Sequence, residues 1–433
     1  MLFLAIITLI LLATSLYIEK KDILSPTVIF NIVWSIILIL FNLQLFETIK
    51  ISDEVVLVFF IMIFCFNIGA ILYNLYKNKH KGNVVFKIGE RVINAPGDYK
   101  LRKWIFIIFS AITIFVLLID EIDIIKNLLS GKTFSYIMQV ANGKGTVEIN
   151  GTFKVLAYLF IVHPMCYAIS PICAVETLVN KKKSYLLLNI IIIALAVAHH
   201  GGRIYIISML VCYLVVAKRN NFDIKSKIKK IVSKLKYALV ILISLLIFII
   251  VSDSRGIEDI WLSFYAYLIC CIPLSSIYTG SILSNYIATT GGMLSLQGLF
   301  YPLFVVLNYV GVKSPKCYLD SFDVLNLIEN NYVSIGNYSS TGINYFLPAG
   351  MYPYIDGGFF LEIIIMLVLG YVLSAYYRSV KINNNEKNVA AYSIMFLGIV
   401  LSFMKLFTQS YGYFLGLFYL LTIFYKKTNL KQK

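Results

Sequence analysis

The sequence is poor in charge and in proline. Only 14% of the 433 residues are charged and nine are proline, whereas about 25% charged residues is typical of soluble globular proteins. Apolar residues reach 59% and the mean hydropathy is +0.82. These values exclude a water-soluble enzyme and a disordered chain. They leave an all-α polytopic integral membrane protein as the expected fold class.

Paired cysteines and nucleotide-binding motifs are also missing. The seven cysteines form no CxxC pair and mostly stand in apolar runs, so we interpret them as packing residues and exclude a disulfide scaffold. The sequence has neither a GxxxxGK[ST] loop nor a GxGxxG that follows a strand. Any reaction must therefore use an activated substrate that is already in the membrane. No HxxxH or HxxE spacing occurs, so we expect no metal and no cofactor.

Apolar runs predict about eleven membrane-spanning helices, although several runs are shorter than the roughly 20 residues that a crossing needs. We interpret 1–17 as a retained first span, because no basic residue precedes its apolar run. Spans one to eight then occupy 1–251, and spans nine to eleven occupy 358–433 with a basic tail. The predicted spans are 1–17, 27–45, 55–75, 104–119, 155–178, 185–198, 204–217, 238–251, 358–377, 389–404 and 410–425.

The basic residues indicate topology. Most of the 38 lysines and arginines lie in connections that follow odd-numbered spans, and such residues are disfavoured in loops that cross the membrane. This parity predicts an N-terminus outside and a C-terminus in the cytoplasm. The net charge of +16 therefore needs no nucleic-acid partner, because a polybasic segment such as 225–236 fits the anionic surface of a lipid bilayer.

The segment 252–357 is the one long connection, and it is predicted to lie on the extracytoplasmic side. It holds seven acidic and three basic residues, together with apolar stretches at 260–278 and 296–312. Pro273 and Pro302 interrupt these stretches. Because broken helices are tolerated where they line a cavity, we expect re-entrant or interfacial helices here, with two further spans as the alternative.

Arg203 and Arg255 are the only arginines expected on the outer side. Arg203 begins span seven and Arg255 follows span eight, so both should emerge at the base of the long loop. A guanidinium offers a rigid fork of donors for phosphate oxygens, which suits a diphosphate whose tail stays in the bilayer. The alternative is that each arginine anchors a helix end or pairs with a nearby aspartate.

Histidines and an aspartate carry groups that can move a proton. His199 and His200 form the tip of a predicted helical hairpin, and imidazole titrates closest to neutral pH. Asp356 precedes two glycines, where its carboxylate could activate a hydroxyl or cap the following helix. His163 stands before Pro164, and we interpret that pair as a kink rather than a site.

A stretch rich in asparagine, serine, threonine and tyrosine precedes Asp356. Side chains of these types hydrogen-bond sugar hydroxyls and stack on sugar faces, although they also build ordinary turns. The candidates for glycan binding are Asn337, Tyr338, Asn344 and Tyr345.

Together these features resemble the Wzy-type oligosaccharide repeat-unit polymerases of bacterial O-antigen and capsule pathways. The resemblance implies a GT-C-like membrane fold in the bacterial cytoplasmic (inner) membrane. Where some members carry a glycine downstream of each arginine, Leu214 and Ala266 stand in this chain. The features that carry the resemblance are the many-span layout, Gly201-Gly202-Arg203, Ser254-Arg255-Gly256 and the polar stretch that ends at Asp356-Gly357-Gly358.

The resemblance also implies a reaction. A metal-independent glycosyltransferase would move a glycan from undecaprenyl diphosphate to a lipid-linked repeat unit on the outer face of the membrane. Arg203 and Arg255 would stabilise the departing diphosphate, and Asp356 or His200 would take the proton of the attacking hydroxyl. A flippase and a chain-length regulator of the same pathway are the implied partners.

Three other functions fit parts of the pattern. An O-antigen ligase shares the large outer loop and the arginine chemistry, but transfers the finished chain to a lipid core. A lipid-linked oligosaccharide flippase or other transporter would favour repeated halves and charges near the membrane midplane, whereas the expected charges gather at the outer rim. A structural membrane scaffold is the remaining alternative.

Overall fold

The computed structural model describes residues 1–79, 99–130, 156–200, 204–220, 260–337, 343 and 346–426. Within these ranges the chain is all-α apart from two three-residue strands, β1 (Tyr99–Leu101) and β2 (Phe424–Lys426). The predicted span 238–251 lies outside the described residues.

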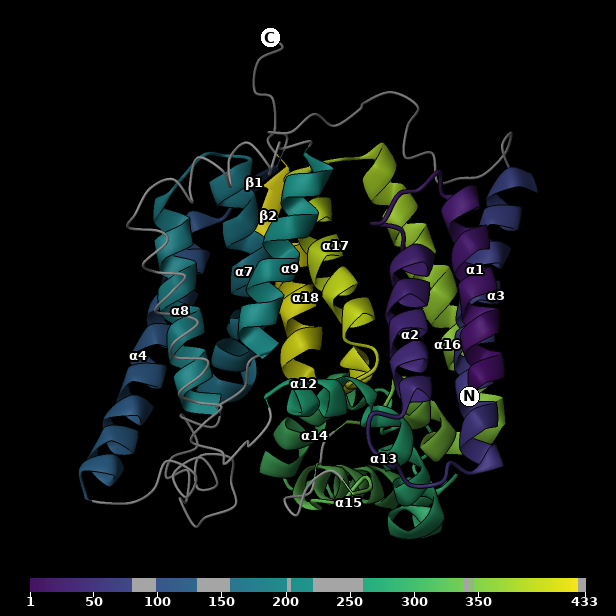
Figure 1. Cartoon of the computed structure of the whole chain (residues 1–433). Coiled ribbons are helices and arrows are strands. Elements are labelled where there is room, and N and C mark those ends of the chain that lie inside the picture. Colours follow the sequence, from purple (N-terminus) through teal and green to yellow (C-terminus); the bar gives the residue numbers. More distant parts are fainter. Residues whose placement is uncertain are drawn as a thin grey trace.

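Long helices run side by side as a bundle (Figure 1). Four helical segments are long and apolar enough to cross a membrane, namely Pro26–Leu43, Asp53–Tyr76, Tyr158–Leu178 and Met351–Ile382, and shorter apolar helices accompany them. The count of eleven spans stays a prediction. The helices of the bundle are α1 (Leu2–Ile18), α2 (Pro26–Leu43), α3 (Asp53–Lys79), α4 (Lys103–Leu129), α7 (His163–Leu178), α8 (Ser184–His200), α9 (Ile204–Arg219), α16 (Met351–Ile382), α17 (Glu386–Val400) and α18 (Tyr411–Ile423).

Large apolar side chains remain on the outside of this bundle. Phe3, Phe115 and Phe360 are 69%, 66% and 75% exposed. Exposed apolar surface on this scale is rare on soluble monomers and marks contact with a lipid or protein partner. The exposed apolar surface and the apolar helices together fit a membrane location.

Glycines bring α3 and α16 into close contact. A Cβ atom on Gly370 would lie 2.0 Å from the Phe66 carbonyl oxygen, and one on Gly69 would lie 2.1 Å from the Leu367 carbonyl oxygen. Small residues allow such close backbone approach between membrane helices. At its other end α16 is interrupted at Gly358, whose φ of +63° favours glycine.

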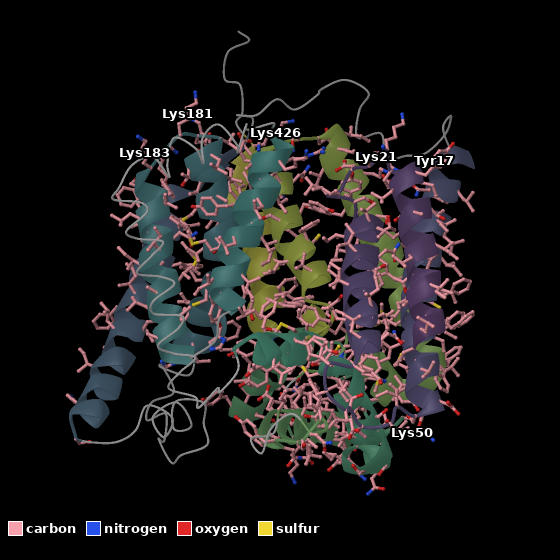
Figure 2. The ribbon with its side chains drawn as sticks, in the orientation of Figure 1. Tyr17, Lys21, Lys50, Lys181, Lys183 and Lys426 are labelled. Atoms are coloured by element: carbon pink, nitrogen blue, oxygen red, sulfur yellow. The ribbon has the colours of Figure 1, made fainter. Side chains whose placement is uncertain are left out.

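The two ends of the bundle differ in charge. Strands β1 and β2 pair antiparallel at one end, which we term the basic end. Figure 2 shows Lys21, Lys181, Lys183 and Lys426 at this end and Lys50 at the opposite one, which we term the loop end. The lysines of two separate connections and of the C-terminal segment thus gather at one end, as the charge parity predicts. The orientation of the two ends in a cell stays a prediction.

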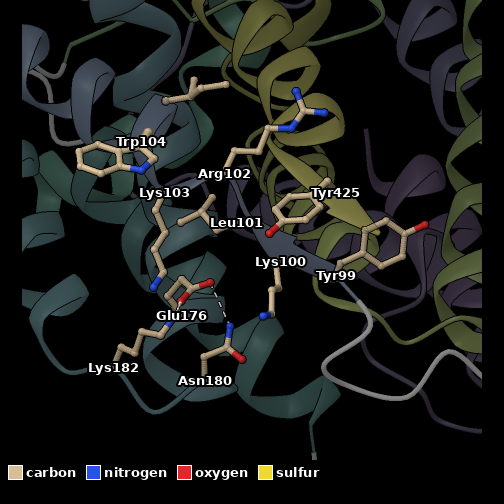
Figure 3. Close-up of a pocket in the computed structure, with 11 residues that line it drawn as sticks. Tyr99, Lys100, Leu101, Arg102, Lys103, Trp104, Glu176, Asn180, Lys182 and Tyr425 are labelled. Atoms are coloured by element: carbon tan, nitrogen blue, oxygen red, sulfur yellow. Dashed lines mark hydrogen bonds and ion pairs between the residues drawn. The ribbon is translucent and has the colours of Figure 1, made fainter. Parts of the chain in front are cut away.

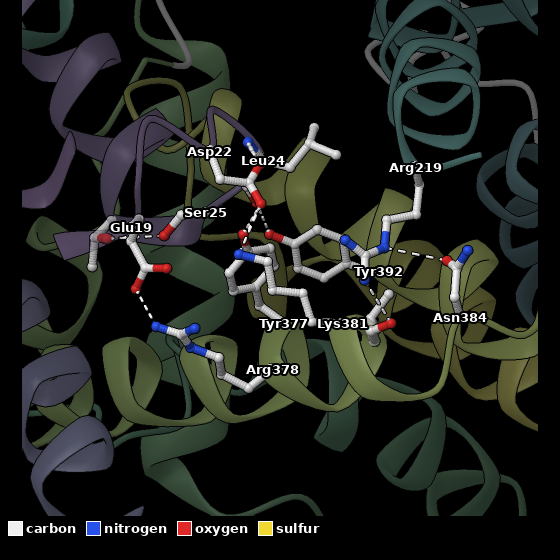
Figure 4. Close-up of polar contacts among 12 residues, drawn as sticks. Glu19, Asp22, Leu24, Ser25, Arg219, Tyr377, Arg378, Lys381, Asn384 and Tyr392 are labelled. Atoms are coloured by element: carbon white, nitrogen blue, oxygen red, sulfur yellow. Dashed lines mark hydrogen bonds and ion pairs between the residues drawn. The ribbon is translucent and has the colours of Figure 1, made fainter. Parts of the chain in front are cut away.

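A polar network ties helices together at the basic end (Figure 4). The Asp22 carboxylate accepts hydrogen bonds from the Tyr377 hydroxyl and from Lys381 Nζ, the latter at 3.0 Å, and Arg378 pairs with Glu19 at 2.8 Å. Burial alone would raise the pKa of Asp22, but the hydrogen bonds from Tyr377 and Lys381 outweigh it and hold that pKa below its usual value. This network joins the connection between α1 and α2 to α16.

Short helices gather at the loop end, below the bundle in Figure 1. The apolar stretches 260–278 and 296–312 form short helices, and α15 is a further helix that the sequence analysis did not foresee. The assignment of 252–357 to an extracytoplasmic loop with re-entrant or interfacial helices stays a prediction. The elements are α12 (Ile260–Ile269), α13 (Cys271–Ile277), a π-helix η3 (Tyr278–Ile282), a 3-10 helix η4 (Ser284–Tyr286), α14 (Gln297–Tyr309) and α15 (Lys316–Asn330).

Candidate functional site

The predicted site residues that the structure describes all lie at the loop end. They are Asp356, Asn337 and the backbone of His200, the last residue of α8. The other predicted site residues lie outside the described residues, and their roles stay predictions: Arg203, Arg255, Tyr338, Asn344 and Tyr345.

Asp356 is 1% exposed, and both of its carboxylate oxygens accept hydrogen bonds. Oδ1 accepts from the Thr290 hydroxyl at 2.6 Å and from the Leu294 N–H at 3.0 Å, and Oδ2 accepts from the Ser295 N–H at 2.7 Å. The Asp356 carbonyl also accepts from the Gly291 N–H at 3.0 Å. The carboxylate therefore holds the turn 288–295 against the kink of α16, rather than capping the helix that follows.

This turn depends on left-handed backbone conformations. Ala288, Gly291 and Gly292 have φ values of +63°, +57° and +91°, and an isolated turn would not hold that geometry at Ala288 without external contacts. The Ala288 N–H donates to the Ile355 carbonyl at 2.7 Å. Asp356 and its neighbour thus fix the segment that leads into α14.

Asn337 fixes a second connection at the loop end. Its Nδ2 donates to Glu47 Oε2 at 2.8 Å, and its backbone N–H donates to the Glu47 carbonyl at 3.1 Å. Thr48 forms an antiparallel bridge with Gly336, whose φ of +142° favours glycine. The side-chain amide of Asn337 is therefore bound to the connection between α2 and α3.

Two histidines meet a tyrosine where α8 ends. The His199 Nε2 atom lies 3.3 Å from the Tyr158 hydroxyl, within hydrogen-bonding distance. The Tyr158 ring lies 5.9 Å from the His163 ring between centroids. Tyr158 begins a π-helix, η2 (Tyr158–Val162), which runs into α7. The π-helix ends where His163 and Pro164 begin α7, and π-turns of this kind are frequent at functional sites. The kink expected at this pair stays a prediction.

The rings continue from α7 to the helices of the loop end. His163 stacks on Tyr411 at 5.2 Å between centroids, and Tyr411 stacks on Tyr301 of α14 at 4.8 Å. Tyr301 in turn contacts Phe322 of α15 at 5.5 Å. We term His199, Tyr158, His163, Tyr411, Tyr301 and Phe322 the ring series.

A glycine beside Tyr411 lets α18 approach α7. A Cβ atom on Gly412 would lie 3.2 Å from the His163 Cβ, so only a small residue fits there without displacing α7. Burial raises the pKa of Tyr301 above its usual value. Chemically, the ring series brings together two imidazoles and three tyrosine hydroxyls, which are groups that hydrogen-bond and that can move a proton.

Glu362 and Lys405 are buried charged side chains that the sequence analysis did not single out. Glu362 of α16 is fully buried, and neither of its carboxylate oxygens has a hydrogen-bond partner among the described residues. Lys405, between α17 and α18, is 6% exposed and lies 5.4 Å from the Phe407 ring centroid. A single acidic residue inside the apolar run 358–377 is a signal that could have identified Glu362, since such residues are often functional.

Within the described ranges, no three histidine, cysteine, aspartate or glutamate side chains gather closely enough to hold a metal ion. Comparison with family models, curated proteins and solved structures finds no match.

Proposed function

We propose that this chain is a membrane glycosyltransferase that polymerises lipid-linked oligosaccharide repeat units, as its resemblance to Wzy-type polymerases implies. The observation that carries the proposal is the ring series, because its two imidazoles and three tyrosine hydroxyls are groups that can move a proton and hydrogen-bond sugar hydroxyls. The series starts at His199, four residues before Arg203 in the sequence, and ends at α15. It therefore supports a glycan site at the loop end.

In the proposed step, a hydroxyl oxygen of the acceptor repeat unit attacks the anomeric carbon of the donor glycan. A new glycosidic C–O bond forms, the bond to the diphosphate oxygen breaks, and undecaprenyl diphosphate leaves. Arg203 and Arg255 are our candidates for stabilising the charge of the leaving group. The hydroxyl proton passes to a base, for which we favour His200, since both oxygens of Asp356 already accept hydrogen bonds. Asp356 is then a positioning residue.

We further propose that the loop end faces outwards across a bacterial cytoplasmic (inner) membrane. The lysines at the basic end support this orientation, because Lys and Arg are enriched in cytoplasmic connections. The N-terminus is then outside and the C-terminus is in the cytoplasm. A flippase that supplies repeat units and a chain-length regulator are the expected partners.

The test is to delete the gene in its host and analyse the surface glycan by gel electrophoresis. Complementation with Arg203→Ala or Arg255→Ala is expected to give single capped units instead of a ladder. Lys313→Ala, which removes an exposed cation at the loop end, is the control and should restore the ladder. Normal long-chain polymer from both arginine variants at normal protein levels would overturn the assignment. If the deletion strain instead accumulates polymer on the lipid carrier and attaches none of it to the lipid core, the chain is a ligase.

One observation favours transport of a lipid-linked oligosaccharide as a second candidate function. Glu362 is a fully buried carboxyl without a hydrogen-bond partner in the described part of α16, and acidic residues inside membrane helices often mark transport paths. Under this alternative, Glu362→Gln would block the appearance of repeat units on the outer face. Under the polymerase proposal, single units still reach the surface in that variant.

A further inference from the structure

A pocket of about 730 Å³ opens at the basic end, between β1, the start of α4 and the connection that follows α7. Ligand pockets usually fall between about 300 and 1,000 Å³, so the space suits a headgroup of moderate size. The lining includes Lys100, Lys103, Trp104, Glu176 and Lys182.

Positive charge dominates the pocket. Figure 3 shows the amino groups of Lys100, Lys103 and Lys182 around Glu176, whereas Arg102 extends away from them. Glu176 is 1% exposed and pairs with Lys182, and it also accepts from Asn180 Nδ2 at 3.0 Å. Among the described residues, Lys100 and Lys103 have no ion-pair partner. Two amino groups are therefore left to bind an anion.

The pocket opens onto an apolar stripe of α4. Trp104, which lines the pocket, is 80% exposed, and Ile108 and Phe115 below it are 52% and 66% exposed. Their spacing of four and seven residues places these side chains on one face of the helix. A ligand with phosphate in the pocket could extend acyl chains along this stripe, and tryptophan is enriched at such membrane–water boundaries.

We propose that this pocket binds the phosphate of an anionic phospholipid, with the acyl chains of that lipid lying along α4. The exposed apolar stripe favours a lipid over a free phosphate, because a soluble anion would leave Trp104 and Ile108 unused. Basic pockets between membrane helices bind anionic headgroups in this way. The proposal is independent of the glycosyltransferase activity.

The test uses the full-length protein, purified in detergent and freed of lipid. Binding of phosphatidylglycerol and of phosphatidylcholine is measured by native mass spectrometry, and stabilisation by phosphatidylglycerol and by inorganic phosphate is compared by thermal shift. The Lys100→Gln/Lys103→Gln variant should bind phosphatidylglycerol about thirtyfold more weakly, since each lysine near an anionic surface contributes about 1 kcal/mol. Lys20→Gln/Lys21→Gln, which changes two exposed lysines between α1 and α2, is the matched control and should bind normally.

Unchanged phosphatidylglycerol binding by the Lys100→Gln/Lys103→Gln variant would overturn the site. Stabilisation by inorganic phosphate equal to that by phosphatidylglycerol would overturn the lipid as the ligand. If the double variant does not fold, Trp104→Ala serves instead, because it keeps every charge and should still weaken phosphatidylglycerol retention. Retention by Trp104→Ala at the level of the unmodified protein would contradict the placement of the acyl chains along α4.

Discussion

The Asp356 carboxylate accepts a hydrogen bond from the Ser295 N–H at 2.7 Å, which ties the segment entering α14 to the kink of α16. Thr290 and Leu294 donate to the other carboxylate oxygen. The buried Asp356 side chain is thus one of the points that attach the helices of the loop end to the bundle, beside the Tyr265 hydroxyl on the Leu40 carbonyl and the Thr408 hydroxyl on the Ser295 carbonyl. This attachment places Tyr301 of α14 against Tyr411 of α18.

Replacement of Asp356 by alanine should lower the free energy of unfolding by about 3 kcal/mol, because buried N–H groups that donated to a charged acceptor lose their partner. Thermal unfolding in detergent measures this loss. Asp323→Ala, on the exposed side of α15, is the control and should change stability by less than about 0.5 kcal/mol. If the Asp356→Ala protein has normal stability and makes no polymer, Asp356 is instead the base that takes the proton of the attacking hydroxyl.

Replacement of Tyr411 by alanine should cost about 3–5 kcal/mol, because the ring between His163 and Tyr301 is lost. Tyr411→Phe keeps the ring and should stay close to the unmodified protein. A double-mutant cycle with Tyr301→Ala, followed by thermal unfolding, should give a coupling of about 0.5–1.5 kcal/mol. Strictly additive effects would show that the two rings do not stabilise one another.

Asp22 should make stability at the basic end dependent on pH. Its folded-state pKa lies below the reference value of 3.8, because hydrogen bonds from Tyr377 and Lys381 outweigh the effect of burial. The stabilisation is therefore fully present above that reference value and is lost as the pH falls through the folded-state pKa. Unfolding curves from pH 3 to pH 7 should show that Asp22→Asn is less stable than the unmodified protein at pH 7. The difference between their free energies of unfolding, which is the gap, should narrow in acid. A gap that stays constant with pH would contradict this account.

Gly370→Ala should destabilise the contact between α3 and α16 by about 1–3 kcal/mol, because the added Cβ would lie 2.0 Å from the Phe66 carbonyl oxygen and the helices must separate. Gly280→Ala is the matched control, since a Cβ there meets nothing within 4 Å. Thermal unfolding of the two variants compares these positions. Equal stability of the two variants would mean that α3 and α16 lie further apart in the membrane than the structure shows.

The apolar runs were sufficient to locate most helices of the bundle, because burial in lipid or protein requires continuous apolar sequence. Helix α15 was missed since its apolar residues are separated by Asp320, Asp323 and other polar residues. The predicted start of span nine at 358 falls at the kink of α16, where Gly357 and Gly358 leave helical geometry, and the helical turn that begins at Met351 was not expected. A pair of glycines resembles a helix start in sequence, whereas in the structure it is a kink inside the helix.

The contacts of the site could not be predicted from sequence in the same way. The ring series joins residues 158, 301 and 411, which are far apart in the chain, and no local pattern records which rings meet. From the sequence, Asp356 could equally activate a hydroxyl or cap a helix. Its contact with the Ser295 N–H gives it a third role, which depends on how the chain folds. Glu362 differs, because a single acidic residue inside an apolar run can be recognised from the sequence alone.

The most direct measurement of the central claim is polymerisation in reconstituted liposomes. The purified chain is supplied with undecaprenyl-diphosphate-linked repeat units extracted from the deletion strain, and the products are separated on a gel. The account predicts a ladder of repeat units from the unmodified chain and none from Arg203→Ala. Repeat units that remain single in the presence of the folded, unmodified chain would contradict it.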